Sequence, residues 1–399
     1  MVPDGWRVQP LGSVVQRVSR PVEVKHDDEY TQIGVRSHGR GVFIKEPVSG
    51  RELGTKRVFH VEPDCLVLNI VFAWEQAVAK TSPEHRGLIA SHRFPMYRPI
   101  YDRSDIEFLR YFFLTPRGKH LLGLASPGGA GRNKTLGQKE LERLVVALPP
   151  LPEQKKIADI LSTWDKAIET TEKLLANAEK QKRALMQQLL TGKRRLKGFD
   201  GREWKEVKLG RIWKVTTGQP APNNPDAYCD EGIPFLRVSC LAPLLKGRSE
   251  GSFEKVSPKT VDQYRLKLFP AGTIVFAKSG MSAKLGRVYR LEGNAYLVSH
   301  LAALLPNPSK ADERFLFYYL QMYPPSDLIQ GDGFPSIKTS LIAERHVNLP
   351  PLPEQIAIAD CLDASDKMVA NYRTQLFSLS GEKRALTQQL LTGNRRVSV

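Results

Sequence analysis

The chain has 399 residues, of which 41% are apolar and 25% are charged, as in an ordinary globular protein of two or three domains. Its first residues lack the apolar core of a secretory signal, and no apolar run is long enough to span a bilayer, so we expect a cytoplasmic protein with no membrane contact. The formal net charge of +17 favours a polyanionic partner such as nucleic acid.

The four cysteines are scattered through the chain and form no CxxC pair. This spacing excludes the usual zinc ribbon and gives no disulfide framework, which fits a reducing compartment. We therefore expect no metal and no cofactor.

The first globular domain is predicted over residues 1–147. Three of its segments, IGVRSHGRG (33–41), NIVFAWEQAV (69–78) and SPGGAGRNKT (126–135), carry side chains that suit DNA. Arg and Lys pair well with guanine, and Asn and Gln with adenine. The candidate DNA-binding residues are Arg36, His38, Arg40, Asn69, Trp74, Gln76, Arg132, Asn133 and Lys134, with the core as an alternative place for Trp74.

A long helix is predicted within residues 148–197. It starts after the turn LPPLP, where Glu153 lies near the positive end of the helix dipole, and it ends at LLTG, where Gly192 suits a left-handed cap. Apolar residues recur at steps of four and three, the period of a left-handed coiled-coil seam. The seam comprises Ile157, Leu161, Trp164, Ile168, Leu175, Leu185 and Leu189, interrupted by Lys182.

The second globular domain is predicted over residues 198–348. Its loop AKSGMSAKLGRV (277–288) places basic side chains around two glycines, which allow the backbone to approach phosphate closely. A second glycine-bearing loop, QGDGFPSIKT (330–339), precedes the next helix. The candidate DNA-binding residues here are Arg237, Lys278, Ser279, Lys284, Arg287, Ser336 and Lys338.

Two aromatic segments, FLRYFFL in the first domain and FLFYYL in the second, have helical spacing and are predicted to be core helices. His92 and His300 each follow a serine in a predicted strand, and we expect both to lie in the core.

The last segment, residues 349–399, repeats the first helical segment 201 positions later without a gap, and about half of the positions are identical. The globular domains repeat more faintly, so the whole chain is a duplication. The second seam comprises Ile358, Leu362, Val369, Leu376, Leu386 and Leu390, interrupted by Lys383. Each helix, roughly 60 Å long at about 1.5 Å per residue, is expected to pair antiparallel with the other.

The run PLPEQ…IAD…ALMQQLLTGKRRL followed by GREWKEVKLG, together with IGVRSHGRGVFIKE and AGTIVFAKSGMSAKLGRV, resembles the specificity subunits of type I restriction–modification systems. The resemblance covers almost the whole chain, although Ser91-His92 replaces the usual Ser-Pro. It implies an α/β (α+β) fold: two similar target-recognition domains joined by two long antiparallel coiled-coil helices, with a pseudo-two-fold internal repeat.

The resemblance also implies the partners. They are double-stranded DNA with a bipartite site, two modification (methyltransferase) subunits, and restriction (translocase and endonuclease) subunits. Two half-sites read from one face of a duplex would lie about one turn, roughly 34–36 Å, apart.

No catalytic motif is found in the sequence, which has neither HExxH nor GxSxG nor the NPP motif of base methyltransferases. We therefore expect a subunit that does no chemistry. Two alternatives stay open: a non-specific basic DNA-binding scaffold, and a P-loop nucleotide hydrolase using Lys134. The second fits poorly, because Asn133 stands where the Walker motif needs glycine.

Overall fold

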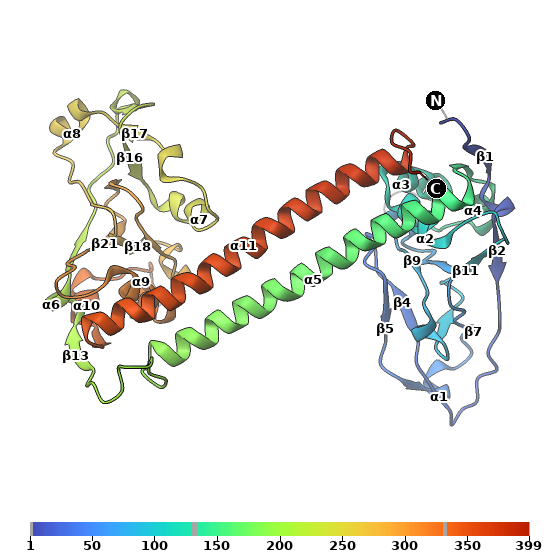
Figure 1. The fold of residues 1–399 in the computed structure, drawn as a ribbon, viewed down its shortest axis with the longest axis horizontal. Coiled ribbons are helices and arrows are strands. Elements are labelled where there is room, and N and C mark those ends of the chain that lie inside the picture. The colour runs from blue at the N-terminus through green and yellow to red at the C-terminus, as the bar shows by residue number, and fades with distance from the viewer. Residues whose placement is uncertain (1–2, 129–133, 330–332, 399) are drawn as a thin grey trace. The chain divides into compact units, whose positions relative to one another are not determined.

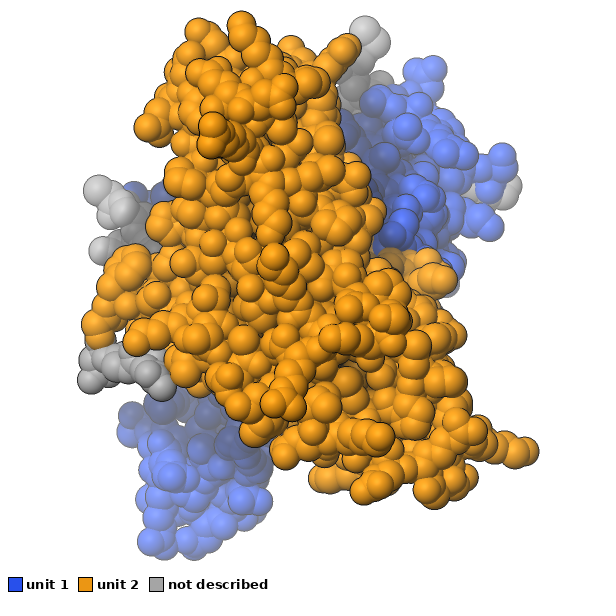
Figure 2. All heavy atoms as spheres, turned by 90° about the vertical axis from the view of Figure 1, so that its left-hand side faces the viewer, with its two compact units in different colours: residues 1–172, 374–399 blue, residues 173–373 orange. Residues whose placement is uncertain are grey.

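The computed structural model describes residues 3–128, 134–329 and 333–398. It divides into two compact units, one of residues 1–172 and 374–399 and the other of residues 173–373 (Figure 2). The two long helices, α5 (Leu151–Leu189) and α11 (Leu352–Leu391), each contribute one part to each unit. The domain bounds expected from the sequence, which give each helix a segment of its own, stay a prediction.

Each unit contains one four-stranded antiparallel sheet of the same topology. In the first unit the order is β2-β11-β8-β9, and in the second it is β14-β21-β18-β19. In both sheets, the strand that comes last in the sequence, β11 or β21, lies between the two that come first. The shared topology shows that the duplication seen in the sequence extends to the fold. The bounds are β2 (Val15–Val18), β8 (Leu66–Leu68), β9 (Val78–Lys80), β11 (Met96–Pro99), β14 (Lys214–Thr217), β18 (Ile274–Ala277), β19 (Val288–Arg290) and β21 (Leu301–Leu305).

The remaining strands of the first unit form two-stranded antiparallel pairs. In one pair, the closing pair, the first strand of the chain pairs with the strand that precedes α5, so the beginning and the end of the domain lie side by side. The other three pairs lie between residues 29 and 91 (Figure 1). The pairs are β1 (Arg7–Pro10) with β12 (Val145–Leu148), β3 (Glu29–Tyr30) with β6 (Val48–Ser49), β4 (Ile33–Val35) with β5 (Val42–Ile44), and β7 (Val58–His60) with β10 (Ile89–Ser91).

The second unit differs by a second four-stranded sheet, in which one neighbouring pair is parallel. It also repeats the closing pair of the first unit. The extra sheet has the order β15 (Tyr228–Cys229), β17 (Lys255–Val256), β16 (Ile233–Leu236) and β20 (Tyr296–Leu297), and the closing pair is β13 (Lys205–Lys208) with β22 (His346–Leu349).

The two aromatic segments are core helices, as predicted. They are α2 (Ile106–Leu114) and α9 (Glu313–Met322), and each is capped by an aspartate that accepts backbone N–H groups of the first turn, Asp105 and Asp312. Their apolar faces pack on the sheet. The short helices are α1 (Gly50–Leu53), α3 (Pro116–Leu124), α4 (Gln138–Arg143), α6 (Leu209–Ile212), α7 (Leu241–Leu244), α8 (Pro258–Tyr264) and α10 (Thr339–Glu344).

Within each unit the two long helices run antiparallel. In the first unit the start of α5 packs against the end of α11, and in the second unit the end of α5 packs against the start of α11. This confirms the predicted mixed fold with antiparallel helices. The structure buries Ile157, Leu161, Leu189, Ile358, Leu362, Val369 and Leu390, and half-buries Trp164, Ile168, Leu175, Leu185, Leu376 and Leu386.

Both long helices end where the sequence predicted. Gly192 and Gly393 have φ values of 70° and 73°, a left-handed conformation that glycine adopts at little cost. All four cysteines are free thiols. Among the described residues, no helix combines the length and the apolar run that crossing a bilayer requires.

Candidate nucleic-acid interface

In the first domain, the turn at residues 36–41 is tied to the loop that follows β8. The backbone N–H of His38 donates to the carbonyl of Glu75 (2.8 Å), and that of Gly39 donates to the carbonyl of Gln76 (3.0 Å). The Ser37 hydroxyl donates to the Glu75 carboxylate at 3.0 Å. Two segments that are far apart in the sequence therefore form one surface.

This turn holds three exposed candidate residues, Arg36, His38 and Arg40. The Arg36 guanidinium lies 4.9 Å from the centre of the Phe43 ring, which orients it, and it forms no ion pair with any residue that the structure describes. His38 has a φ of 59°, an uncommon conformation for a residue other than glycine. The three side chains stay available to a ligand.

The loop after β8 uses its own candidate side chains internally. The Asn69 side chain accepts the backbone N–H of Val71 at 3.1 Å, and the Trp74 indole donates to the Val71 carbonyl at 3.1 Å. The Gln76 amide donates to the carbonyls of Phe113 (2.9 Å) and Thr115 (3.3 Å). These contacts give Asn69 and Gln76 a structural role, and their polar groups are used within the domain.

Lys134 is brought to this loop from the segment before α4. Its ammonium lies 5.5 Å from the centre of the half-buried Trp74 ring, and the backbone N–H of Leu136 donates to the Ile70 carbonyl at 2.8 Å. The neighbouring candidates Arg132 and Asn133 lie outside the described residues.

In the second domain, the loop between β18 and β19 is joined to the segment before α10. The backbone N–H of Gly280 donates to the Pro335 carbonyl (2.9 Å), and that of Ile337 donates to the Lys278 carbonyl (2.7 Å). Ser279 and Ser336 form an antiparallel bridge between them. Both loops predicted for this domain therefore belong to one surface.

Four candidate side chains are exposed on this surface: Lys284, Arg287, Ser336 and Lys338. Lys278 is half-buried. The Ser279 hydroxyl lies 2.7 Å from Nδ1 of His300. His300 and His92 are both exposed, so their predicted place in the core was wrong; each stands just beyond a buried strand, where the chain turns.

Arg237 makes its side-chain contacts with residues outside these two joined loops. Its guanidinium donates to the Glu254 carboxylate (3.0 Å) and to the Tyr228 hydroxyl (2.8 Å), and it lies over the rings of Tyr228 and Phe235. A half-buried arginine with these partners stabilises its own domain.

The two interface loops have the same backbone conformation at one point. Each contains a short 3₁₀ turn, Ala73–Glu75 in the first domain and Ala283–Leu285 in the second, and the residue after each turn has a left-handed conformation. That residue is Gly286 in the second domain (φ 58°) and Gln76 in the first (φ 59°). Glycine adopts this conformation freely, whereas Gln76 is held in it by its two side-chain hydrogen bonds.

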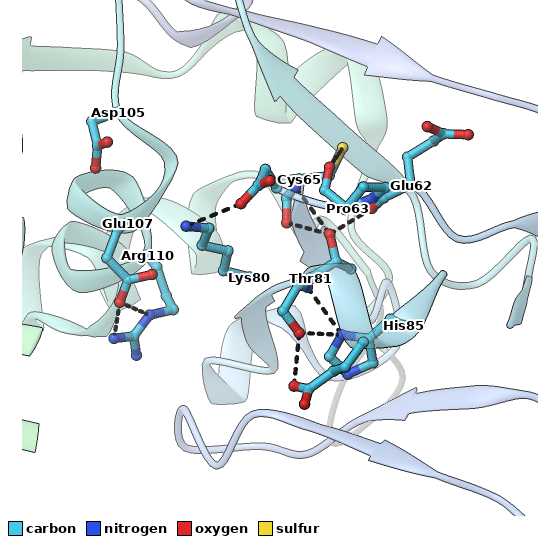
Figure 3. A network of polar contacts seen from close by, with 12 residues as sticks. Glu62, Pro63, Cys65, Lys80, Thr81, His85, Asp105, Glu107 and Arg110 are labelled. Carbon is cyan, nitrogen blue, oxygen red and sulfur yellow. Dashed lines mark hydrogen bonds and ion pairs between the residues drawn. The ribbon is translucent and has the colours of Figure 1, made fainter. Parts of the chain in front are cut away.

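A dense polar network in the first domain lies around Thr81, which directly follows β9 (Figure 3). The Thr81 hydroxyl donates to the Glu62 carbonyl at 2.6 Å and accepts the backbone N–H of Cys65 at 2.9 Å. Burial raises the pKa of the Cys65 thiol to about 12, so this thiol is not a nucleophile at neutral pH.

The residue after Thr81 is a serine that lies beside a histidine, a pairing that occurs in hydrolases. The Ser82 hydroxyl lies 2.7 Å from Nδ1 of His85 and 2.7 Å from the Glu84 carboxylate. A catalytic triad needs the carboxylate on the histidine, not on the serine. Nδ1 also accepts the backbone N–H of Ser82 at 3.0 Å, so this cluster caps the turn at Pro83–His85.

Comparison with known proteins gives consistent matches over the whole chain. The family model for the type I restriction modification DNA specificity domain matches residues 67–180 and 201–376. The type I restriction enzyme MjaVIII specificity subunit of Methanocaldococcus jannaschii is 25% identical over 418 residues, with 99% of this chain and 94% of that protein covered. The MjaIX specificity subunit of the same organism is 27% identical over 339 residues, with 79% and 77% covered.

Solved structures show the same fold. The S subunit of a type I restriction-modification system from M. genitalium matches with a TM-score of 0.63 and 15% identity, covering 98% of this chain and 99% of that one. The HsdS subunit from Thermoanaerobacter tengcongensis matches with a TM-score of 0.51 and 21% identity, covering 99% and 98%.

Proposed function

The chain belongs to the family of type I restriction–modification DNA specificity proteins, and from that premise we propose that its two globular domains each read one half of a bipartite DNA site. The observation that carries this proposal is the contrast within the duplication. The helices are about half identical, whereas the loops at the candidate interfaces present different side chains. Two similar helices can bind two copies of the same partner protein, whereas two dissimilar loop surfaces can recognise two different DNA sequences.

The two reading surfaces differ in chemistry. The first presents Arg36, His38 and Arg40 on one turn, and the second presents Lys284, Arg287 and Lys338 on two joined loops. Guanidinium and ammonium groups bind phosphate as well as guanine, so some of these contacts position the protein and others distinguish bases. An asymmetric bipartite site follows from two such surfaces on one chain.

We further propose that the helices recruit two copies of the same modification subunit. Substitutions at exposed helix positions cost little stability, so exposed residues of two diverged copies should differ unless a partner constrains them. Seven positions of α5 and α11 are exposed in both copies and identical between them. They are Pro152, Asp159, Lys166, Arg183, Ala184, Gln187 and Gln188, with Pro353, Asp360, Lys367, Arg384, Ala385, Gln388 and Gln389 as their counterparts.

Gln187→Ala combined with Gln188→Ala tests this recruitment surface. Because the surface occurs twice, the variant should bind one modification subunit in place of two, as measured by analytical ultracentrifugation of the complex. Lys180→Ala, an exposed change on the same helix that is not shared between the copies, is the matched control. Two subunits bound to both variants would contradict the proposed surface. Recruitment of restriction subunits stays a prediction.

In this proposal the chain supplies no catalytic group, and the methylation chemistry belongs to the modification subunit. Methylome sequencing of cells with and without this chain tests the function as a whole. A new asymmetric motif with two specific parts and an unread spacer is expected. An unchanged methylome in cells that hold the assembled complex would overturn the proposal.

A variant of each reading surface then assigns the half-sites. Arg36→Ala with Arg40→Ala should relax one part of the motif, and Ser336→Ala, which removes an exposed hydroxyl of the second surface, should relax the other. A non-specific scaffold would instead show no preference in competition between the cognate duplex and random duplex.

A further inference from the structure

The second reading surface carries two large apolar side chains in contact with water. Phe334 is 77% exposed and Met281 is 70% exposed. Both flank the same short stretch, because a Cβ atom added at Gly280 would lie 3.7 Å from Cζ of Phe334. Phe334 therefore lies beside Gly280, the residue that precedes Met281, and we call Phe334 and Met281 the apolar pair.

The backbone next to each residue of the apolar pair is anchored, at Gly280 before Met281 and at Pro335 after Phe334. Pro335 and Ile337 are buried, and both make backbone hydrogen bonds to the neighbouring loop, to Gly280 and Lys278 respectively. Gly280 has a φ of 76°, which brings the two loops together in a conformation that favours glycine. The exposure of the pair is thus built into the fold of the domain.

The two loops that carry the apolar pair are basic. Lys284, Arg287 and Lys338 are exposed on them, and residues 278–291 and 333–343 contain neither aspartate nor glutamate; Asp332, two positions before Phe334, lies outside the described residues. Within the described part of the chain, none of these three cations has a carboxylate within ion-pair distance. An apolar centre with a cationic rim is complementary to nucleic acid, whose bases are apolar on their faces and whose backbone is anionic.

Among the described residues of the first domain, the loop after β8 carries no such arrangement. Trp74 is half-buried there, its indole N–H is used by the Val71 carbonyl, and Lys134 covers its ring. The most exposed large apolar side chain of that loop is Phe72, at 40%. Within the described parts of the two domains, the apolar pair therefore distinguishes the second reading surface from the first.

We propose that Phe334 and Met281 form an apolar wedge that enters the base stack of the second half-site and unstacks one base step. Lys284, Arg287 and Lys338 then bind the phosphates on either side. Proteins that insert phenylalanine or methionine between base pairs unstack and kink the duplex in this way. The inference rests on the proposed function, since it needs a cognate half-site.

The test uses the full-length chain and its cognate duplex, with 2-aminopurine or pyrrolocytosine placed in turn at each base of the second half-site. The wild-type chain should raise the fluorescence several-fold at one step, because unstacking relieves quenching. Phe334→Ala should abolish this signal and weaken cognate binding about tenfold, with random-sequence binding unchanged. Phe334→Trp should retain the signal. Phe377→Ala, which removes an 82% exposed phenylalanine of α11, is the matched control and should behave as wild type.

The outcomes separate the two proposals. Cognate-specific binding without brightening at any step would overturn the wedge alone, as would an unchanged signal in Phe334→Ala. If binding depends instead on thymine methyl groups, deoxyuridine in place of thymine will weaken wild-type binding without any brightening, and the wedge is again excluded. Equal binding to cognate and random duplex would overturn the proposed function and the wedge together.

Discussion

Lys383 of α11 forms an ion pair with Asp165 of α5, and the same two residues of the other copies, Lys182 and Asp366, form the same pair with the helices exchanged. Each aspartate also accepts a tyrosine hydroxyl from the core helix beside it, Tyr111 at 2.5 Å and Tyr318 at 2.7 Å. Each ammonium lies 5.4 Å from the centre of that tyrosine ring.

These paired charges select the register of the helices. An apolar seam with a heptad period would tolerate a shift by one heptad, but such a shift would separate both lysines from both aspartates at once. Two polar interruptions of the seam are therefore satisfied only in the observed arrangement.

Replacing Lys383 by methionine should lower the free energy of unfolding by about 1–2 kcal/mol, because it leaves the half-buried Asp165 carboxylate without its nearest cation. Urea denaturation of the full-length chain measures this loss. Lys166→Met, an exposed change on α5, is the control and should stay within about 0.5 kcal/mol of wild type. A Lys383→Met variant as stable as the control would show that the ion pair does not fix the helices.

The Asp165 carboxylate should also make stability depend on pH. Burial would raise its pKa, but hydrogen bonds from Lys383 and Tyr111 outweigh burial and hold the pKa below its ordinary value. A carboxylate with a lowered folded-state pKa stabilises the fold above its unfolded-state pKa, and that stabilisation is lost as pH falls through the folded-state pKa.

Stability should therefore fall as the pH drops below about 4, and Asp165→Asn should flatten this dependence while lowering stability at neutral pH. Urea midpoints between pH 7 and pH 3 provide the measurement. Asp159→Asn, an exposed change on the same helix, should keep the wild-type dependence. Parallel pH profiles for wild type and Asp165→Asn would exclude this carboxylate as the source.

The register could be predicted only in part from the sequence. Lys182 and Lys383 interrupt the predicted seam and are therefore noticeable in the sequence. Their partners, Asp165 and Asp366, lie outside the seam and have the pattern of ordinary surface carboxylates. The sequence does contain one signal. Asp165 and Asp366 occupy the same position in the two helical segments, although only about half of the positions of these segments are identical. Antiparallel pairing of a repeat places such residues next to each other's lysine.

The interface residues were harder to assign for a physical reason. Residue type and spacing indicate which side chains can bind DNA, but not which of them the domain uses for itself. Gln76 and Arg237 have the chemistry to contact bases, yet their polar atoms bind carbonyls, a carboxylate and a hydroxyl of their own domain. No sequence pattern indicates a role for Phe334 and Met281, because a sequence does not show which apolar side chains are exposed to solvent.

Arg195, in the segment that follows α5, and Glu354, in the first turn of α11, form a second contact whose loss should be costly. The Glu354 side chain is fully buried, and it accepts two hydrogen bonds from the Arg195 guanidinium at 2.6 and 2.7 Å. Arg195 also donates to the carbonyls of Phe199 and Arg202. A lysine carries its three donors on a single nitrogen and lacks the planar fork, so it cannot reproduce the bidentate carboxylate contact together with both carbonyl contacts.

Arg195→Lys should therefore lower the free energy of unfolding by about 2–3 kcal/mol, and Arg195→Ala by about 3–5 kcal/mol, since the alanine leaves a buried charge unpaired. Thermal and urea unfolding measure both. The adjacent Arg194 is exposed, so Arg194→Lys is a matched control with the same change and no effect. Equal stability of the two lysine variants would contradict the role of the bidentate pair.

The cations of the second reading surface should determine part of the salt dependence of DNA binding. Each phosphate that a cation neutralises releases counterions, so the slope of log K against log salt concentration reports the number of such contacts. Lys284→Ala and Arg287→Ala should each reduce the magnitude of that slope by about one. Lys259→Ala makes the same change of charge on α8 of the same domain and should leave the slope unchanged, because Lys259 is exposed outside the two interface loops. Fluorescence anisotropy of the full-length chain on its cognate duplex, from 50 to 200 mM salt, separates these cases. If all three variants reduce the slope equally, the loss follows net charge alone, and the two loops are not the phosphate-binding surface.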